Sequence, residues 1–311
     1  MAQYLQLQKN EILAITKKYN LKQTGYEPIE EGAGNTSYLV QTAQRQYILT
    51  IFEIENNRVV NLCKLLNMLE EHNFPTTRVK IMGNGEETIG IQGKSAMLKP
   101  FIAGHVVKDM DEDMLGQVGA AMARLHQMPT PDYLPNQHPY GLEFIHRVMD
   151  QDINSEYKKW LAQRYEVLQR TIPSGLPEGL IHGDVFYDNV LFDGKKFKAL
   201  IDFEEACKYY KVFDLGMAVV GMCTKKMDIR LPKVQSLIYG YQKIRILERV
   251  EQRALKLFIE YAASATSAWR YWKFNIETPI AEKSEKYKEM VDIAKAADAI
   301  SNEEFMVSVF H

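Results

Sequence analysis

The chain has 311 residues, of which 46% are hydrophobic and 25% charged, so it can bury a sizeable core and is more consistent with two lobes than with one. Its formal net charge of -2 gives no overall positive field that would favour nucleic acid or an anionic membrane. An anionic ligand would therefore need local cations, backbone N–H groups or a metal ion.

Targeting and redox features are sparse. No stretch of the chain is apolar for long enough to span a bilayer, and residues 1–20 alternate polar and apolar side chains instead of forming the apolar core of a signal peptide. The three cysteines, Cys63, Cys207 and Cys223, form no close pair and no metal-ligand spacing, which is typical of a reducing compartment. We expect a cytoplasmic protein with neither a nucleic-acid nor a membrane partner, and these features do not specify its oligomeric state.

The first third of the chain is predicted to be rich in strands. Amphipathic spacing of apolar residues predicts helices at 8–19 and 57–72. Short apolar runs bounded by turn residues predict strands at 26–29, 37–41, 46–52, 78–82, 88–91 and 95–98.

After a Pro/Gly joint near 99–104, the pattern becomes mainly helical. A strand–loop–strand unit is expected at 180–202. Helices are expected at 111–127, 142–170, 212–223, 233–243, 249–274 and 281–300. Strands followed by helices predict the α+β fold class.

The segment from Ile181 to Phe203 carries the residues best suited to chemistry. Asp184 and Asn189 stand five positions apart, and Asp202 follows within an Ile-Asp-Phe tripeptide. Protein kinases use this spacing: one Asp accepts the hydroxyl proton, and an Asn and a later Asp bind magnesium. Two acidic turns at strand ends would explain a lone His-x-Asp, but the combination favours phosphoryl transfer.

This segment resembles the aminoglycoside phosphotransferase and choline kinase superfamily, most nearly its type II homoserine kinases. The resemblance rests on HGDVFYDN and IDFEEA, and on four further stretches: EEGAGNTSY at 30–38, QYILTIFE at 46–53, VGAAMARLH at 118–126 and SAWRYW at 267–272. It implies a protein-kinase-like two-lobe fold with an N-terminal antiparallel sheet and helix and a larger, mainly helical C-terminal lobe. The ATP-binding lobe would be 1–98, the hinge 99–104, and the catalytic and substrate-binding lobe 105–311.

The resemblance also implies roles for single residues. Asp184 would be the catalytic base, and Asn189 and Asp202 would bind Mg2+. His182 would support the loop, and Asp214 would anchor the N-terminus of a helix.

ATP would be bound by two segments of the N-terminal lobe. Small residues let backbone N–H groups approach phosphates, and the hinge would read adenine with backbone groups. The expected residues are Gly32, Ala33, Gly34, Asn35 and Thr36 over the phosphates, and Met97, Lys99 and Phe101 at the hinge. A plain hairpin and an ordinary linker are the competing interpretations. Thr50 stands where many kinases have a lysine, which leaves the phosphate-binding cation unidentified.

Three residues are expected to contact the acceptor substrate. Arg270 would bind a carboxylate, with an interhelical ion pair as the alternative, and Tyr187 would line the pocket. Glu204 would meet an ammonium group, because Glu204-Glu205 stands where homoserine kinases usually have Tyr-Phe.

The sequence therefore predicts an ATP- and magnesium-dependent kinase that phosphorylates the hydroxyl of a small amino-bearing metabolite, foremost homoserine. Choline, ethanolamine or aminoglycosides are alternative acceptors within the same class. A non-catalytic, nucleotide-binding protein with a kinase fold is the alternative from another class.

Overall fold

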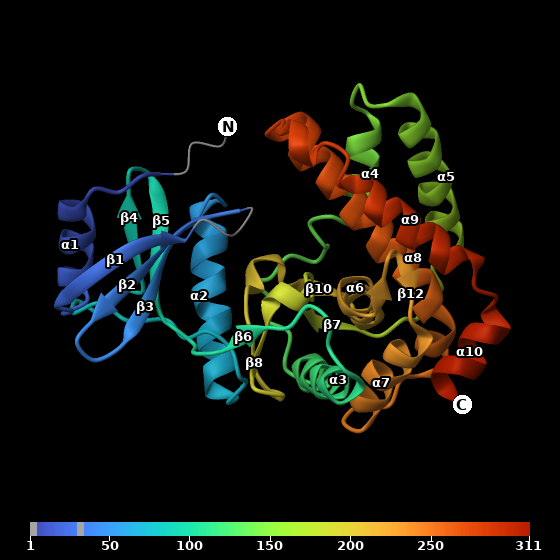
Figure 1. Ribbon diagram of the computed structural model, residues 1–311, viewed down its shortest axis with the longest axis horizontal. Helices are drawn as coiled ribbons and strands as arrows, with labels where there is room; N and C mark the ends of the chain where they lie inside the picture. The colour runs from blue at the N-terminus through green and yellow to red at the C-terminus, as the bar shows by residue number, and fades with distance from the viewer. Residues whose placement is uncertain (1–4, 30–33) are drawn as a thin grey trace. The chain divides into compact units, whose positions relative to one another are not determined.

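The computed structural model describes residues 5–29 and 34–311 (Figure 1). Contacts divide the chain into two compact units. The N-terminal unit ends at Gly104 but also includes Ala199–Glu204, whereas the C-terminal unit comprises His105–Lys198 and Glu205–His311. The chain therefore returns to the N-terminal unit for one short segment, which contains Asp202.

The N-terminal unit is built on one antiparallel sheet. The strand order is β1-β2-β3-β5-β4, with β1 Gln23–Ile29, β2 Thr36–Thr42, β3 Gln46–Ile51, β4 Thr88–Ile91 and β5 Lys94–Pro100. The sheet lies between helix α1 (Lys9–Lys18) and helix α2 (Asn56–Glu71) (Figure 1). Alternate strand residues such as Leu49, Ile51 and Leu98 join Ile12 and Ile15 of α1 in a buried cluster, because side chains alternate between the faces of a sheet.

The strand expected at 78–82 is absent, which corrects the prediction. Lys80 donates its N–H to Leu98 O at 2.8 Å, but no ladder forms around this bond. Instead, Arg78 folds back on its own chain and donates to Thr76 O and Phe74 O. The apolar residues of this segment pack as irregular chain beside β5.

The C-terminal unit is mainly helical. Its helices are α3 Glu112–His126, α4 Leu142–Met149, α5 Ser155–Thr171, α6 Lys211–Met222, α7 Leu231–Gln242, α8 Arg249–Tyr271, α9 Tyr287–Ala299 and α10 Asn302–Phe310. Its strands are β6 His105–Val106, β7 Glu178–Ile181, β8 Val190–Asp193, β10 Cys207–Tyr210, β11 Thr224–Lys225 and β12 Asp228–Ile229, with β9 Lys196–Leu200 crossing the unit boundary.

Two of the expected long helices do not continue as one α-helix. The helix expected at 142–170 is two helices, because Asn154 caps α5 by accepting the N–H groups of Glu156 and Tyr157. The helix expected at 249–274 leaves the α form after Tyr271 and continues as a π-helix at Trp272–Glu277.

Glycines set the closest helix contact of this unit. A Cβ on Gly119 of α3 would lie 2.0 Å from Leu237 O of α7, and a Cβ on Gly240 of α7 would lie 2.0 Å from Gly116 O. Only hydrogen fits at these points, so the two backbones approach directly. No helix in the described part of the chain is long and apolar enough to cross a membrane.

Candidate functional site

The loop after β7 presents Asp184 by means of a glycine turn. Gly183 has φ +87°, and a Cβ there would lie 2.5 Å from Glu205 O, so both the conformation and the space require glycine. His182 is fully buried, and its Nδ1 accepts the N–H of Asp184 at 3.2 Å. The structure thus places His182 behind the loop and leaves Asp184 partly exposed.

Asn189 ties the far end of this loop to Asp184. Its Nδ2 donates to Asp184 O at 2.8 Å and to Asp184 Oδ2 at 3.1 Å. The short turn Tyr187–Asn189 is closed by the N–H of Asn189 donating to Phe186 O at 3.0 Å. Both amide hydrogens of Asn189 are therefore engaged, and its Oδ1 is the atom left for another partner.

Asp214 holds the loop from beneath. This fully buried carboxylate accepts the N–H groups of His182 and Gly183, each at 2.8 Å, and contacts His126 Nε2 at 3.1 Å. Burial acts to raise the pKa of Asp214, but the hydrogen bonds that it accepts, from His126 and from the N–H of His182 among others, outweigh burial and hold that pKa below its usual value. Asp214 lies in the first turns of α6, yet it binds the loop rather than the amides of its own helix.

His126 and Tyr241 extend this buried network. Tyr241 OH lies 2.7 Å from His126 Nδ1 and accepts from Arg245 Nη1 at 3.0 Å. Because the carboxylate of Asp214 can only accept, we assign the N–H of a neutral His126 to Nε2, so that Nδ1 accepts from Tyr241 OH. Burial lowers the pKa of His126, which favours this neutral form. His126 was visible in the VGAAMARLH motif, but no spacing rule connects it with Asp214.

His138 is a second buried histidine, and no motif in the sequence marks it. Its Nε2 donates to Gly183 O at 2.9 Å, and its Nδ1 accepts the N–H of Tyr140 at 3.1 Å. Burial lowers the pKa of His138 to about 4, against smaller opposing effects of Gly183 O and Asp214. It lies in the proline-containing loop before α4, where no periodicity marks a buried position.

Aromatic side chains gather beside this loop around a carboxylate. Tyr140 OH donates to Glu205 Oε1 at 2.7 Å. The ring of Tyr140 lies 5.8 Å from that of Trp269 and 5.4 Å from that of Phe144. The backbone of Glu205 also borders Gly183, so this group adjoins the turn that carries Asp184.

A second set of predicted residues belongs to the N-terminal unit. Asp202 is exposed and has φ +68°, an uncommon conformation for a residue with a side chain. Asn35 donates from Nδ2 to Glu204 Oε1 at 2.5 Å and accepts the N–H of Glu53 at 3.0 Å. Arg58 of α2 donates to Glu204 O at 3.0 Å. Glu204 is therefore tied to Asn35 and α2, a different setting from the ammonium contact expected of it.

Lys99 belongs to the same set. Its Nζ lies 5.6 Å from the centre of the Phe52 ring. Burial lowers the pKa of Lys99, and the carboxylates of Glu204 and Asp202 counteract part of this effect. The sequence predicts a backbone contact of Lys99 at the hinge, whereas in the structure it is the side-chain ammonium whose pKa the charges of Glu204 and Asp202 affect.

The other predicted nucleotide contacts are placed as follows. Gly32 and Ala33 lie outside the described residues, and Gly34 is exposed just before β2. Thr36 begins β2, and its hydroxyl accepts the N–H of Leu5 at 3.1 Å. Met97 is buried in β5, and the N–H of Phe101 donates to Gln46 O at 3.0 Å. An adenine contact at the hinge stays a prediction.

The remaining substrate candidates have partners of their own. Arg270 of α8 donates from Nη1 to Glu289 Oε2 of α9 at 2.9 Å and to Lys286 O at 3.1 Å. The ring of Tyr187 lies 5.8 Å from Lys108 Nζ. Arg270 thus joins two helices, in the arrangement that the sequence left open as an alternative.

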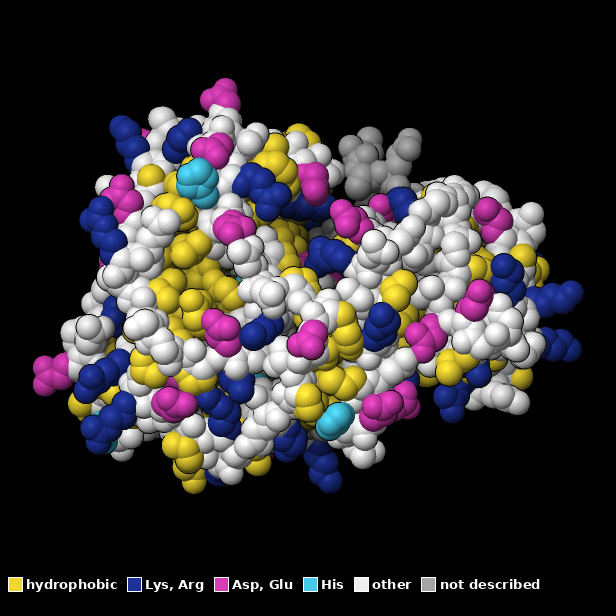
Figure 2. All heavy atoms as spheres, turned by 180° about the vertical axis from the view of Figure 1, so that it is seen from behind, with side chains coloured by type: hydrophobic (Ala, Val, Ile, Leu, Met, Phe, Trp, Pro, Cys, Tyr) yellow, Lys and Arg dark blue, Asp and Glu magenta, His cyan; other side chains and the backbone are white. Residues whose placement is uncertain are grey.

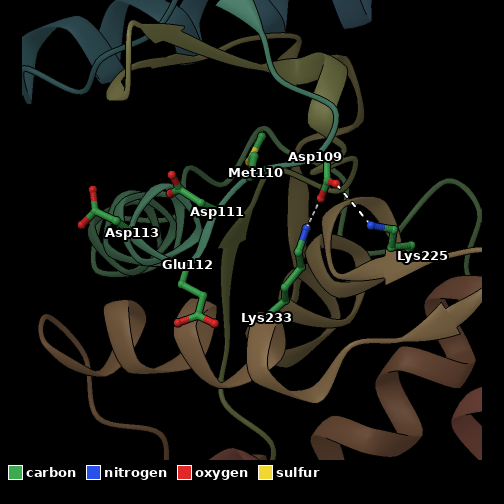
Figure 3. Close-up of a pocket in the computed structure, with 7 residues that line it drawn as sticks. All are labelled: Asp109, Met110, Asp111, Glu112, Asp113, Lys225 and Lys233. Atoms are coloured by element: carbon green, nitrogen blue, oxygen red, sulfur yellow. Dashed lines mark hydrogen bonds and ion pairs between the residues drawn. The ribbon is translucent and has the colours of Figure 1, made fainter.

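An open surface pocket lies elsewhere on the C-terminal unit (Figure 3). None of the predicted site residues lines it, and its Asp109 pairs with Lys233 and Lys225. It is lined by Asp109, Met110, Asp111, Glu112, Asp113, Lys225 and Lys233. Mixed charge of this kind is common on the surface, since acidic and basic side chains are also interspersed on the face seen in Figure 2. The pocket holds paired surface charges and is not part of the site.

The chain is similar in sequence to known proteins over most of its length. Residues 25–247 match the phosphotransferase enzyme family. Homoserine kinase from Chelativorans sp. (strain BNC1) is 30% identical over 274 residues, 85% of either chain. Homoserine kinase from Bartonella tribocorum is 27% identical, over 81% of this chain and 82% of the relative. These matches confirm the resemblance predicted from the motifs.

Solved structures agree on the fold. An amicoumacin kinase in complex with AMP-PNP and Ca2+ has a TM-score of 0.76 at 14% identity, over 96% of this chain and 97% of its own. A microcompartment-associated aminopropanol kinase has a TM-score of 0.73 at 17% identity, over 94% and 97%. The predicted kinase-like α+β fold, with an N-terminal antiparallel sheet and a mainly helical remainder, is confirmed.

Proposed function

Since the chain belongs to the phosphotransferase enzyme family and is a small-molecule phosphotransferase, we propose that ATP is its phosphoryl donor and that the hydroxyl of a small amino-bearing metabolite, homoserine first, is its acceptor. The observation that carries the proposal is the pairing of Asp184 with Asn189 on one glycine-hinged loop. Relatives named homoserine kinase support the choice of acceptor.

Asp184 is the proposed base. It is partly exposed, and its backbone is held by His182 and Asn189. A carboxylate fixed in this way can orient an acceptor hydroxyl and take its proton as the phosphoryl group is transferred. Asp214 is a positioning residue, because it affects the reaction only through the backbone N–H groups of the loop that it binds.

Asn189 and Asp202 are the proposed oxygen ligands of the magnesium that accompanies ATP. The described residues contain no cluster of three or more His, Cys, Asp or Glu that could hold a metal. That fits magnesium bound with a nucleotide, which takes one or two protein oxygens beside phosphates and water. The uncommitted Oδ1 of Asn189 and the exposed carboxylate of Asp202 are hard donors of this kind. Such an ion would offset the charge of the transferring group.

Glu205 is the proposed partner of the acceptor's ammonium group. It lies against Gly183, next to Asp184, and its carboxylate is held by Tyr140. Trp269 adds an aromatic ring, whose face attracts cations. This assignment moves the expected ammonium contact from Glu204 to its neighbour.

The same aromatic rings favour a second candidate. Choline or ethanolamine carries a cationic amine and a hydroxyl but no carboxylate, and would need only Glu205 and the rings of Tyr140 and Trp269. Homoserine needs a cation for its carboxylate as well, and Arg270 is the proposed one. Use of Arg270 would require the substrate to compete with Glu289.

The test is ATP turnover against homoserine, choline, ethanolamine and an aminoglycoside. We expect the highest kcat/KM for homoserine, and a preference for choline or ethanolamine would support the second candidate. Binding of ATP without turnover of any acceptor would contradict the proposal and favour a non-catalytic nucleotide-binding protein.

A pair of variants locates the amine contact. Glu205→Gln should raise the KM of the acceptor by about tenfold without changing that of ATP, because a charge-assisted hydrogen bond is lost. The matched control is Glu178→Gln at the exposed start of β7. Equal effects of the two variants would remove Glu205 from the site.

A further inference from the structure

We propose that the side-chain ammonium of Lys99 on β5 is the cation that contacts the phosphates of ATP, in place of the lysine that many kinases carry on β3. The inference rests on the proposed use of ATP. It is carried by the register of the sheet and by the contacts of Lys99 within the N-terminal unit.

The register places Lys99 on the same face as Thr50. In the β3–β5 ladder, Ile48 pairs with Lys99 and Thr50 pairs with Met97. Directly opposed residues share a face, and residues two apart along a strand share it too. Lys99 is therefore the diagonal neighbour of Thr50, on the face opposite to the cluster packed on α1.

The side chain of Lys99 extends along the sheet from the level of Ile48 toward Phe52. Its backbone is level with Ile48, yet its Nζ lies 5.6 Å from the centre of the ring of Phe52. Phe52 follows β3 directly, two residues beyond Thr50. A lysine at position 50 would project from the same face of the sheet, so the ammonium of Lys99 lies on the face where that of a β3 lysine would lie.

The carboxylate partner of this lysine has also changed place. Kinases pair the β3 lysine with a glutamate of the following helix. Here α2 has acidic residues only at Glu70 and Glu71, its last two positions. Among the carboxylates, Glu204 is the one whose charge most raises the pKa of Lys99, and Asn35 and Arg58 donate hydrogen bonds to Glu204.

Other basic residues of this unit are less suited to the role. Arg45 is exposed in the turn between β2 and β3, and Lys94 pairs with Glu53 at 2.5 Å. Arg58 donates to Glu204 O. Lys99 is the one among them that the register places on the sheet face of Thr50, and the charges of both Glu204 and Asp202 act to raise its pKa.

The test measures nucleotide affinity by direct titration with ATP, ADP and adenosine, using Lys99→Met, Lys99→Arg and the matched control Lys94→Met. Lys99→Met should weaken ATP and ADP by about 10- to 100-fold and leave adenosine unchanged, because only phosphates lose a partner. Lys99→Arg keeps the charge and should keep most of the ATP affinity. Lys94→Met should match the wild type.

Turnover gives a second measurement. Lys99→Met should lower kcat by about 10²–10³-fold, the usual cost of removing one preorganised charge contact, while the KM of the acceptor stays constant. Equal losses for ATP and adenosine, or unchanged ATP affinity, would overturn the role of Lys99. A wild type that binds ATP but turns over no acceptor would contradict the proposed function alone, since the comparison of ATP with adenosine still tests Lys99.

Discussion

The side-chain amide of Asn189 donates to the carboxylate and to the carbonyl of Asp184, at 3.1 and 2.8 Å. One residue thereby fixes both the position of the proposed base and the direction of its own amide oxygen. The two residues act as a unit, so a change in either is expected to disturb the other.

Asp184→Asn is expected to lower kcat by about 10²–10⁴-fold, because the amide cannot take the hydroxyl proton. The backbone contacts of residue 184 remain, so the thermal unfolding midpoint should change little. Steady-state kinetics and a thermal melt measure the two effects. The control is Asp193→Asn at the end of β8, where the side chain is 77% exposed. Near-wild-type turnover of Asp184→Asn would refute the assignment.

The protein is expected to lose stability as the pH falls from about 6.5 to 4, because His138 must stay neutral in the folded state. Its folded pKa is about 4, so in this window the unfolded chain binds a proton that the native state does not. The loss from this residue reaches about 3 kcal/mol at the acid end. A protonated His138 would also set a second N–H against the N–H of Tyr140.

Denaturant unfolding across this pH window measures the effect. His138→Gln is less stable at neutral pH but should show a flatter decline, since the titrating group is gone. His126 also has a lowered pKa and supplies a remaining slope in both proteins. Identical pH profiles of the two proteins would mean that His138 does not contribute.

Arg270→Ala is expected to raise the KM of homoserine by about tenfold or more and to leave that of ATP unchanged, because the substrate carboxylate loses its cation. Glu289→Ala removes the same ion pair but keeps the arginine, so it is the matched control. If both variants behave alike in kinetics and stability, Arg270 only joins α8 to α9.

Gly119→Ala is expected to lower the free energy of unfolding by about 1–3 kcal/mol or more, because its Cβ would overlap the backbone of α7 at Leu237 and Tyr241. Gly116→Ala is the same change one turn earlier in α3, where the nearest atom, Ser236 O, is 3.6 Å away. It should be neutral or stabilising by up to about 1 kcal/mol, since alanine favours helix. Denaturant unfolding of both variants tests this, and equal effects would contradict the close helix contact.

Local patterns allowed much of the fold to be predicted. The strand at Thr88–Ile91 and the first helices lie where their periodicity indicated, because side-chain burial on one face repeats along the chain. The strand expected at 78–82 was wrong because local periodicity has a limit. Apolar alternation does not reveal whether a neighbouring strand is in place to form a full ladder of hydrogen bonds. Arg78 satisfies backbone carbonyls there instead.

The sequence by itself determined the chemistry: Asp184, Asn189 and Asp202 stand in a spacing that few activities need, and that spacing can be read along one dimension. Only the tertiary structure decided which residues distant in the sequence come together. Asp214 and His126 meet beneath the loop across 88 positions, and Lys99 comes beside Thr50 through the pairing of two strands. Contacts of this kind depend on the register of the sheet and on helix packing, which no local pattern encodes.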